Sequence, residues 1–546
     1  MKKISSLGVC LMVFVLSSAG QKNASALSRP KLVVGIVVDQ MRWDYLYRYF
    51  DGYTETGFKR IIKEGFSCEN TLIDYVPTVT AIGHSTIYTG SVPSIHGIAG
   101  NDFIENATGN RLYCTEDPGV STVGSTSRAG KMSPKNLLAS TITDELKLAT
   151  NFRSKVIGIA LKDRGAILPA GHAADAAYWF DDATGNFITS TWYMQELPQW
   201  VQKFNKQKLA EKYLKQDWNT LNGIKSYQQS SADDNAYEGL FNDKKAPIFP
   251  IHTSTMFDKD FGIIRSTPYG NTLTAEMAKA AIVNERLGQR NETDFLTVSF
   301  SSTDYVGHKF GVNAIETEDT YLRLDKDLGD LLAFLDARIG KGMYTLFLTA
   351  DHGAAHNIDF LKDNKIPSER WSGSTTLKGL NKMLEETFAV KELVLNLMNY
   401  QVHLNYHAID SSKLDEESIR KASVKFLRKS PAIMYVADMD QIGNESIPEV
   451  IKQKMINGYN KERSGCIQLV LKPATSSAGR TGTGHGAWNP YDSHIPLLWM
   501  GWGIRHGFTN RHTGMIDIAP TLAALLHIQE PNGSIGTPVS EILHQK

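Results

Sequence analysis

The sequence has little cysteine, no excess charge of either sign and no apolar run long enough to cross a membrane. Only 4 of its 546 residues are cysteines, and 58 basic residues balance 58 acidic ones. This balance argues against a general nucleic-acid binder, which carries a basic excess. A hydrophobic content of 42% with 21% charged residues is typical of a globular chain. Overall neutrality still allows an anion site inside the protein.

The N-terminal residues have the pattern of a secretory signal peptide. Lys2 and Lys3 precede the apolar run Leu7–Leu16, which is shorter than the roughly 20 residues that span a bilayer. Ala24-Ser25-Ala26 is then a cleavage site, so that residues 1–26 are removed; a single N-terminal anchor is the alternative. We therefore predict a periplasmic or secreted protein with no membrane partner after signal removal.

Cleavage would leave Cys68, Cys114 and Cys466 in a compartment that permits disulfides. Three thiols cannot all pair within one chain, which excludes a disulfide framework. A single bridge between Cys68 and Cys114 stays open at this point. Stability must therefore come from a hydrophobic core.

Apolar, β-branched segments recur along the chain, and polar residues follow most of them. They lie at 31–39, 154–161, 294–300, 343–350 and 494–500. Helical patterns at 271–287 and 316–335 separate some of them, and this alternation predicts an α/β fold with a mostly parallel sheet. Two stretches, about 189–258 and 364–471, interrupt the alternation, and we interpret both as cap insertions. The length allows either several domains of roughly 150 residues or one large elaborated α/β domain, which would span 27–546.

Acidic and imidazole side chains follow the predicted strands, at the edge where open α/β sheets bind ligands. The candidates are Asp39, Asp304, His308, Asp351, His352 and His485. Carboxylate and imidazole groups suit zinc. Asp304 and His308 are four residues apart and can share one side of a helical turn. Asp351 and His352 are adjacent, so in an extended strand their side chains point in opposite directions, and they could bind the same metal only if the chain turns there. Otherwise they would bind neighbouring metals. A further alternative is that the acids are ordinary turn residues that end their strands.

A candidate nucleophile lies just before a predicted helix at 81–88. Thr78 and Thr80 follow Pro77, and the N-terminus of a helix favours anions. Metal coordination would lower the pKa of a threonine hydroxyl and make it nucleophilic. The alternative is that Thr78 or Thr80 is an ordinary helix cap, and the segment by itself favours that reading.

The motifs together resemble the alkaline phosphatase superfamily. PTVT at 77–80 with TGSVPSIHGIAGN at 89–101 is similar to the nucleophile region of nucleotide pyrophosphatase/phosphodiesterases. DYVGH at 304–308, DHG at 351–353 and His485 match the superfamily's zinc-ligand motifs in order. Lys162-Asp163-Arg164 resembles the Lys/Arg pair of the PafA-type bacterial alkaline phosphatases, which are exported monoesterases.

This resemblance implies a three-layer α/β sandwich with cap insertions and an exported enzyme that hydrolyses small-molecule phosphate monoesters at a site with two Zn²⁺ ions. One zinc would be held by Asp39, Thr80, Asp351 and His352, and the other by Asp304, His308 and His485. Thr80 would be the nucleophile and form a phosphothreonine. Asn101, Lys162 and Arg164 would bind the nonbridging phosphoryl oxygens. A monomer with no specific nucleic-acid partner is expected.

Two alternatives stay open. A monoester dianion carries one more charged oxygen than a diester, so Lys162 and Arg164 favour a monoesterase. These residues could instead form a solvated charged turn, or Arg164 could pair with Asp163 or another acid. A phosphodiesterase of the same superfamily is the main enzymatic alternative. A secreted pseudo-enzyme that captures phosphate compounds is the alternative of another class. The segment Thr80-Ala81-Ile82-Gly83-His84 lacks the Pro and Arg of a sulfatase motif.

Overall fold

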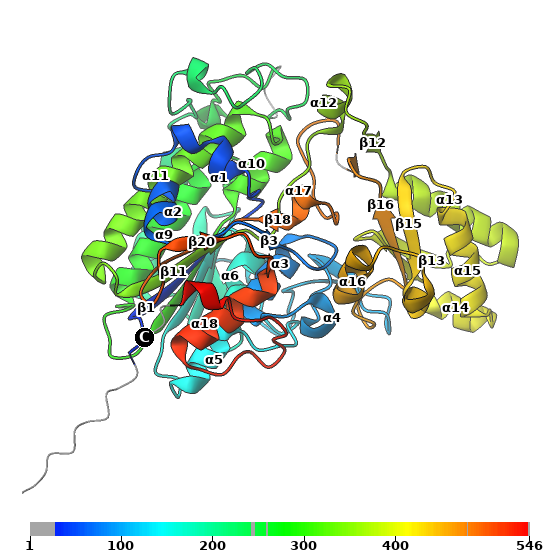
Figure 1. Cartoon of the computed structure of the whole chain (residues 1–546), viewed down its shortest axis with the longest axis horizontal. Helices are drawn as coiled ribbons and strands as arrows, with labels where there is room; N and C mark the ends of the chain where they lie inside the picture. Colours follow the sequence, from blue (N-terminus) through cyan, green and yellow to red (C-terminus); the bar gives the residue numbers. More distant parts are fainter. Residues whose placement is uncertain (1–27, 242–245, 258–259, 478, 544–546) are drawn as a thin grey trace, which may run out of the picture.

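The structure, a computed structural model, describes residues 28–543 except 242–245, 258–259 and 478 (Figure 1). The predicted signal peptide lies outside these described residues. Over the described part of the chain, no helix combines the length and the apolar character that a membrane span needs.

A ten-stranded mixed sheet forms the centre of the molecule. Its strands, in spatial order, are β20 (Gly507–Thr509), β2 (Phe66–Cys68), β19 (Leu497–Gly501), β11 (Tyr344–Thr349), β1 (Leu32–Val38), β10 (Asp294–Phe300), β7 (Val156–Ala160), β8 (Ala176–Asp181), β9 (Asn186–Ser190) and β6 (Thr122–Val123). The five strands from β11 to β8 are parallel, and antiparallel strands flank them. All seven residues of β1 are buried, as its unbroken apolar run requires.

Helices cover both faces of this sheet (Figure 1). One face carries α2 (Phe58–Glu64), α9 (Tyr269–Asn284) and α11 (Ile315–Arg338), and the other carries α3 (Thr80–Thr89), α5 (Ile142–Ala149), α6 (Asp163–Ala170) and α18 (Ile518–Leu526). The predicted α/β sandwich is therefore confirmed. The apolar run at 494–500 does not form one strand, because Pro496 divides it. His494–Ile495 forms β18 in a small separate sheet, and only Leu497–Gly501 joins the central sheet.

Shorter elements surround the sandwich. They are α1 (Tyr45–Arg48), α4 (Pro93–His96), α10 (Ser302–Phe310), α12 (Ile358–Asp363), α17 (Pro490–Ser493), β3 (Thr71–Leu72), β21 (Thr513–Gly514), and the hairpin of β4 (Asp102–Ile104) and β5 (Arg111–Tyr113). Cys68, Cys114 and Cys466 are buried free thiols, so the described residues contain no Cys68–Cys114 bridge.

The segment at 189–258 packs onto the sandwich itself. It contains α7 (Gln199–Lys206) and α8 (Leu209–Leu214). Its buried side chains Leu214, Trp218 and Ile251 belong to the same hydrophobic core as the central strands. Trp218 also donates a hydrogen bond from Nε1 to Asp319 of α11, at 2.7 Å.

The segment at 364–471 has a sheet and a core of its own, and we call it the cap. Its antiparallel strands run in the order β13 (Val394–Met398), β14 (Gln401–Leu404), β16 (Ile467–Leu471) and β15 (Ile433–Asp438). Its helices are α13 (Gly373–Phe388), α14 (Tyr406–Ser412), α15 (Glu416–Leu427) and α16 (Glu449–Gly458). Figure 1 shows this sheet with α13, α14 and α15 standing to the right of the sandwich.

Candidate active site

The ends of adjacent parallel strands bring the predicted polar residues to one place. Asp39 follows β1, Lys162 follows β7, Asp304 follows β10 and Asp351 follows β11. All four side chains are almost completely buried. Because these strands are neighbours and parallel, their carboxyl ends lie at the same sheet edge, as the sequence predicts for the ligands.

Helix α10 carries two of these candidates on one side. It begins directly after β10, so Asp304 lies in its first turn and His308 in its last. The four-residue spacing places His308 Nε2 at 3.2 Å from Asp304 Oδ1. Asp304 and His308 therefore share one side of the helix, as the sequence predicts.

Asp351 and His352 lie in a turn rather than in a strand. β11 ends at Thr349, so their side chains need not point in opposite directions. His352 Nε2 lies 3.5 Å from Asp351 Oδ2 and 3.7 Å from Asp39 Oδ1. Potential ligand atoms of Asp39, Asp351 and His352 all lie within 4.8 Å of one another, close enough for one metal ion.

Thr80 is the first residue of α3, and neither nearby threonine caps this helix. Val79 occupies the N-cap position without a side-chain hydrogen bond, and Thr78 instead donates to the Ala487 carbonyl at 3.0 Å. The helix-cap interpretation of Thr78 and Thr80 is therefore wrong. Thr80 Oγ1 instead lies 3.5 Å from His352 Nε2 and 3.4 Å from Lys162 Nζ.

A glycine lets α3 come this close to the sheet edge. A β-carbon at Gly83 would lie 2.4 Å from the carbonyl oxygen of Asp351 and 2.6 Å from its Cβ. Such contacts are impossible for a larger residue without a shift of the backbone. Gly83 thus allows the first turn of α3, with Thr80, to pack directly against the end of β11.

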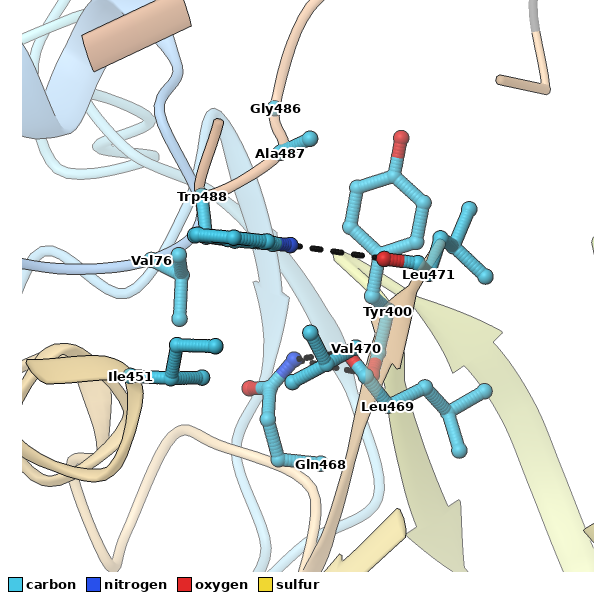
Figure 2. A pocket seen from close by; sticks show the side chains of 10 residues that line it. All are labelled: Val76, Tyr400, Ile451, Gln468, Leu469, Val470, Leu471, Gly486, Ala487 and Trp488. Carbon is cyan, nitrogen blue, oxygen red and sulfur yellow. Dashed lines mark hydrogen bonds between the residues drawn. The ribbon is translucent and has the colours of Figure 1, made fainter. Parts of the chain in front are cut away.

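His485 reaches the site from a loop at the boundary with the cap. Its Nε2 lies 3.2 Å from His308 Nε2 and 3.7 Å from Asp304 Oδ1. Asp304, His352 and His485 form a second group whose ligand atoms lie within 4.8 Å of one another. Figure 2 shows how the following residues are held: Trp488 Nε1 donates to the carbonyl of Leu471, at the end of β16, at 3.3 Å.

The three candidate imidazoles are oriented in the same way. Nδ1 of His308, His352 and His485 lies 2.8 to 3.0 Å from the carbonyl oxygens of Thr483, Gly353 and Thr78, respectively. A carbonyl only accepts hydrogen bonds, so each ring carries its proton on Nδ1. This support through Nδ1 is common for metal-binding histidines, whose Nε2 is then the atom that can bind a metal.

Two buried carboxylate oxygens in this cluster have no hydrogen-bond partner among the described residues: Asp39 Oδ1 and Asp351 Oδ2. Buried ionised oxygens without a partner are costly, and a divalent cation would satisfy them. Asp39 and Asp304 share a cationic neighbour, because Lys162 Nζ lies 2.6 Å from Oδ2 of each. The donor set of carboxylates and imidazoles fits zinc.

Burial and neighbouring charges shift the pKa values of these groups in opposite directions. Burial, with the charge of Asp351, raises the pKa of Asp39 well above its usual value. Burial acts the same way on Asp304, but His308 and Lys162 outweigh it and hold the pKa of that carboxyl well below its usual range. Burial lowers the pKa of His352 and of His485, which keeps both imidazoles neutral and able to bind a metal near pH 7.

Asn101 and Arg164 border the cluster. Asn101 Oδ1 accepts a hydrogen bond of 2.9 Å from the Ala81 amide of α3, which leaves its NH₂ group for another acceptor. Arg164 Nη1 donates to Tyr113 Oη at 2.9 Å, and Tyr113 donates to Asp163 Oδ1 at 2.9 Å. Over the described residues Arg164 forms no ion pair, and its Nε has no partner. The alternative of an Arg164–Asp163 pair is therefore wrong.

Sequence reasoning missed three residues that support the site. Gln40 donates from Nε2 to Asp304 Oδ1 at 2.6 Å and from its amide to Asp351 Oδ1 at 3.1 Å. His84, one helical turn after Thr80, lies 2.9 Å from the Thr80 carbonyl through Nδ1. Tyr113 is the third. The position of Gln40 beside Asp39 and the four-residue spacing of His84 are signals that could have found them; Tyr113 has none.

The chain is similar to known proteins over most of its length. A model of the type I phosphodiesterase / nucleotide pyrophosphatase family matches residues 33–494. The chain is 57% identical to a calcium-transporting ATPase of Myroides odoratus, over 95% of this chain and 96% of that one. It is 52% identical to the alkaline phosphatase PhoV of Synechococcus elongatus, over 99% and 100% of the two chains.

A third relative has a solved structure. The alkaline phosphatase PafA of Elizabethkingia meningoseptica is 51% identical over 98% of both chains. A crystal structure of PafA matches with a TM-score of 0.93, and the match covers 95% of this chain and 100% of that chain. A second PafA structure is that of a mutant in which serine replaces a threonine and alanine replaces an asparagine, a lysine and an arginine.

Proposed function

The chain belongs to the type I phosphodiesterase / nucleotide pyrophosphatase family, and on that premise we propose that it is an alkaline phosphatase that forms a phosphothreonine at a two-zinc site. Its full-length relatives PhoV and PafA are alkaline phosphatases, enzymes that hydrolyse phosphate monoesters. The substrates we propose are small-molecule monoesters.

One observation carries the proposal: a buried threonine hydroxyl lies among two groups of metal-binding side chains and a lysine. Thr80 Oγ1 is within 3.5 Å of both His352 Nε2 and Lys162 Nζ. Asp39, Asp351 and His352 would hold one zinc together with Thr80, and Asp304, His308 and His485 the other. When bound, the two ions would act as Lewis acids toward the attacking and leaving oxygens.

The chain's own groups supply the other requirements of phosphoryl transfer. Thr80 lies at the N-terminus of α3, where free amide groups favour a developing anion. Lys162 places a positive charge 3.4 Å from the Thr80 oxygen, which favours its deprotonated form. Thr80 would take the phosphoryl group as the alcohol leaves, and water would then cleave the phosphothreonine to release phosphate and restore the hydroxyl.

Three polar residues would bind the nonbridging oxygens of the phosphoryl group: Asn101, Lys162 and Arg164. Tyr113 holds one end of the Arg164 guanidinium, which leaves its other donors for a phosphate. The substituted PafA whose structure is solved is changed at the same four residue types, Thr, Asn, Lys and Arg. Two cations suit the dianion of a monoester better than the monoanion of a diester.

The experiment that tests this proposal compares an aryl monophosphate with the matching bis-aryl diester. We expect purified protein to contain about two zinc ions by its ligand sets, to favour the monoester in kcat/KM, and to lose both activities on chelation until Zn²⁺ is added back. Because a relative is named an ATPase, ATP belongs in the substrate panel.

A double variant then separates monoesterase from diesterase. Lys162→Ala with Arg164→Ala should reduce monoester turnover at least about tenfold more than diester turnover, since hydrogen bonds to charged groups are the stronger ones. Lys203→Ala with Lys206→Ala, on α7, is the matched control for loss of two charges. Equal losses on both esters would mean that the two cations are structural, and zinc-containing protein without any turnover would favour the pseudo-enzyme.

We also propose that residues 1–26 direct export and that the enzyme works in the periplasm or outside the cell. The support is the signal-like sequence alone, because these residues lie outside the described structure. Fractionation of expressing cells tests it: the full chain should be found outside the cytoplasm, and a chain that starts at residue 27 should stay inside.

A further inference from the structure

A pocket with a volume of 260 Å³ opens beside the candidate active site, between the sandwich and the cap. From the sandwich it is lined by Val79, the residue before Thr80, and by His485. From the cap it is lined by Trp371, Leu397 and Tyr400. His485, a candidate ligand, lines the pocket, so the pocket adjoins the candidate site. Its wall combines aromatic and apolar side chains with polar ones such as Asn399 and Ser477.

Trp371 lines this pocket and carries a buried indole N–H group. Its side chain is only 7% exposed, and Nε1 has no acceptor among the residues that the structure describes. Buried indole N–H groups normally find a partner, because leaving one unpaired is unfavourable. A ligand that carries an acceptor would supply that partner.

Tyr400 adopts a backbone conformation that its residue type disfavours. Asn399 and Tyr400 connect β13 to β14 with φ angles of 56° and 59°. Such a two-residue turn prefers Asn and then Gly, so an aromatic residue at the second position is strained. The Tyr400 ring nevertheless lies 5.8 Å from the Trp371 ring, and it also lines the apolar crevice drawn in Figure 2, next to Trp488.

The same turn is fixed to the catalytic segments on both sides. Asn399 Nδ2 donates to the Asp102 carbonyl at 3.0 Å, one residue after Asn101. On the other side a β-carbon at Gly486 would lie 3.2 Å from Tyr400 Cε2, so the loop that follows His485 packs closely against the Tyr400 ring. The aromatic wall of the pocket therefore has a set position relative to the site.

We propose that this pocket binds the leaving group of the substrate and selects an aromatic leaving group with a hydrogen-bond acceptor at its edge. The flat ring would lie against Trp371 and Tyr400, which gain more from an aromatic than from an aliphatic partner. The acceptor would bind the Trp371 N–H. This inference rests on the proposed phosphomonoesterase function and names the substrate class that function would prefer.

The test uses three monoesters of primary alcohols, so that leaving-group reactivity stays similar: cyclohexylmethyl, benzyl and pyridylmethyl phosphate. Methyl phosphate serves as a substrate too small to fill the pocket. For the unaltered protein we expect kcat/KM to rise about tenfold from cyclohexylmethyl to benzyl phosphate and further to pyridylmethyl phosphate. Trp371→Ala should abolish both of these increases in kcat/KM, and it should change methyl phosphate turnover by less than about twofold.

Two further variants keep the outcome interpretable. Trp371→Phe retains a ring without the N–H, so it should keep the benzyl preference and lose only the pyridylmethyl gain. Tyr406→Ala removes a half-buried aromatic from the cap core outside the pocket and controls for destabilisation of the cap. A pyridylmethyl gain that survives in Trp371→Phe would overturn the role of the N–H group.

The results also distinguish this inference from the proposed function. If the protein hydrolyses all four monoesters without an aromatic preference, or if Trp371→Ala reduces all of them equally, the leaving-group pocket is refuted and the phosphatase proposal stands. If methyl and benzyl phosphate are both left intact by zinc-containing protein, the proposed function itself fails.

Discussion

The sandwich and the cap contribute different kinds of residue to the site. Every candidate metal ligand, the candidate nucleophile and both cations come from the sandwich and its loops, and several of them follow parallel strands whose register is fixed over many residues. The cap contributes aromatic and amide side chains from a single turn and from Trp371. Under the two proposals above, the sandwich would determine the reaction and the cap would influence which substrate is preferred.

The two insertions differ in a related way. The segment at 189–258 shares the core of the sandwich, so its removal would expose that core. The cap buries most of its apolar residues in a cluster of its own. It meets the sandwich through hydrogen bonds such as that of Asn399 and through a smaller cluster in which Val76 packs against cap residues that include Met455 and Val470. A subdomain with its own core can vary its contacts with the site without unfolding the sandwich.

The largest effect is expected in the sandwich, at the nucleophile. Thr80→Ala should lower kcat/KM for every monoester by at least about 10³-fold, aromatic or not, because the covalent route needs the hydroxyl. Thr80→Ser keeps the oxygen and should retain most of the activity. Steady-state kinetics on methyl and benzyl phosphate check this. Near-normal turnover by the alanine variant would identify another nucleophile.

An intermediate effect is expected at the cap turn formed by Asn399 and Tyr400, where Asn399 bonds to the Asp102 carbonyl. Asn399→Gly preserves the positive φ of the turn and removes the hydrogen bond to Asp102. We expect the benzyl over cyclohexylmethyl preference to fall about fivefold, the equivalent of one hydrogen bond of about 1 kcal/mol. Methyl phosphate should be affected little.

Lys413→Gly supplies the control for this change, since Lys413 also has a positive φ, of 54°, but lies outside the pocket. A loss of methyl phosphate turnover equal to the loss of preference would mean that the cap shapes the reaction itself.

The smallest effect concerns stability in the sandwich. Burial alone would lower the pKa of His172, but its hydrogen bond and charge interaction with Asp144, at 3.0 Å, raise it. The charged pair therefore stabilises the fold fully below the usual histidine pKa of about 6.5, and this stabilisation is lost as pH rises through the raised value.

His172→Gln should accordingly lower Tm by on the order of 1 °C at pH 5.5 and by less at pH 9. Thermal unfolding of this variant beside His407→Gln, an exposed cap histidine, checks the prediction. A larger destabilisation at pH 9 than at pH 5.5 would contradict it.

Much of the site was predictable from local patterns in the sequence. Asp39, Asp304 and Asp351 each come after a largely apolar segment, and the four-residue spacing of Asp304 and His308 reflects the period of a helix. The roles of Tyr113, Gln40 and the cap turn were not predictable, because each depends on contacts between segments far apart in the chain. Tyr113, for example, meets Arg164 from 51 residues away.

The sequence by itself determined the fold class, because hydrophobic periodicity is a local property, and its resemblance to a known family supplied the candidate nucleophile and the candidate ligand sets. Only the tertiary structure decided which side chains meet. It placed Thr80 beside His352 and Lys162 rather than in a helix cap, paired Arg164 with Tyr113 rather than Asp163, and set Tyr400 against the His485 loop. Such contacts depend on how separate elements pack, and no local pattern of residues encodes that packing.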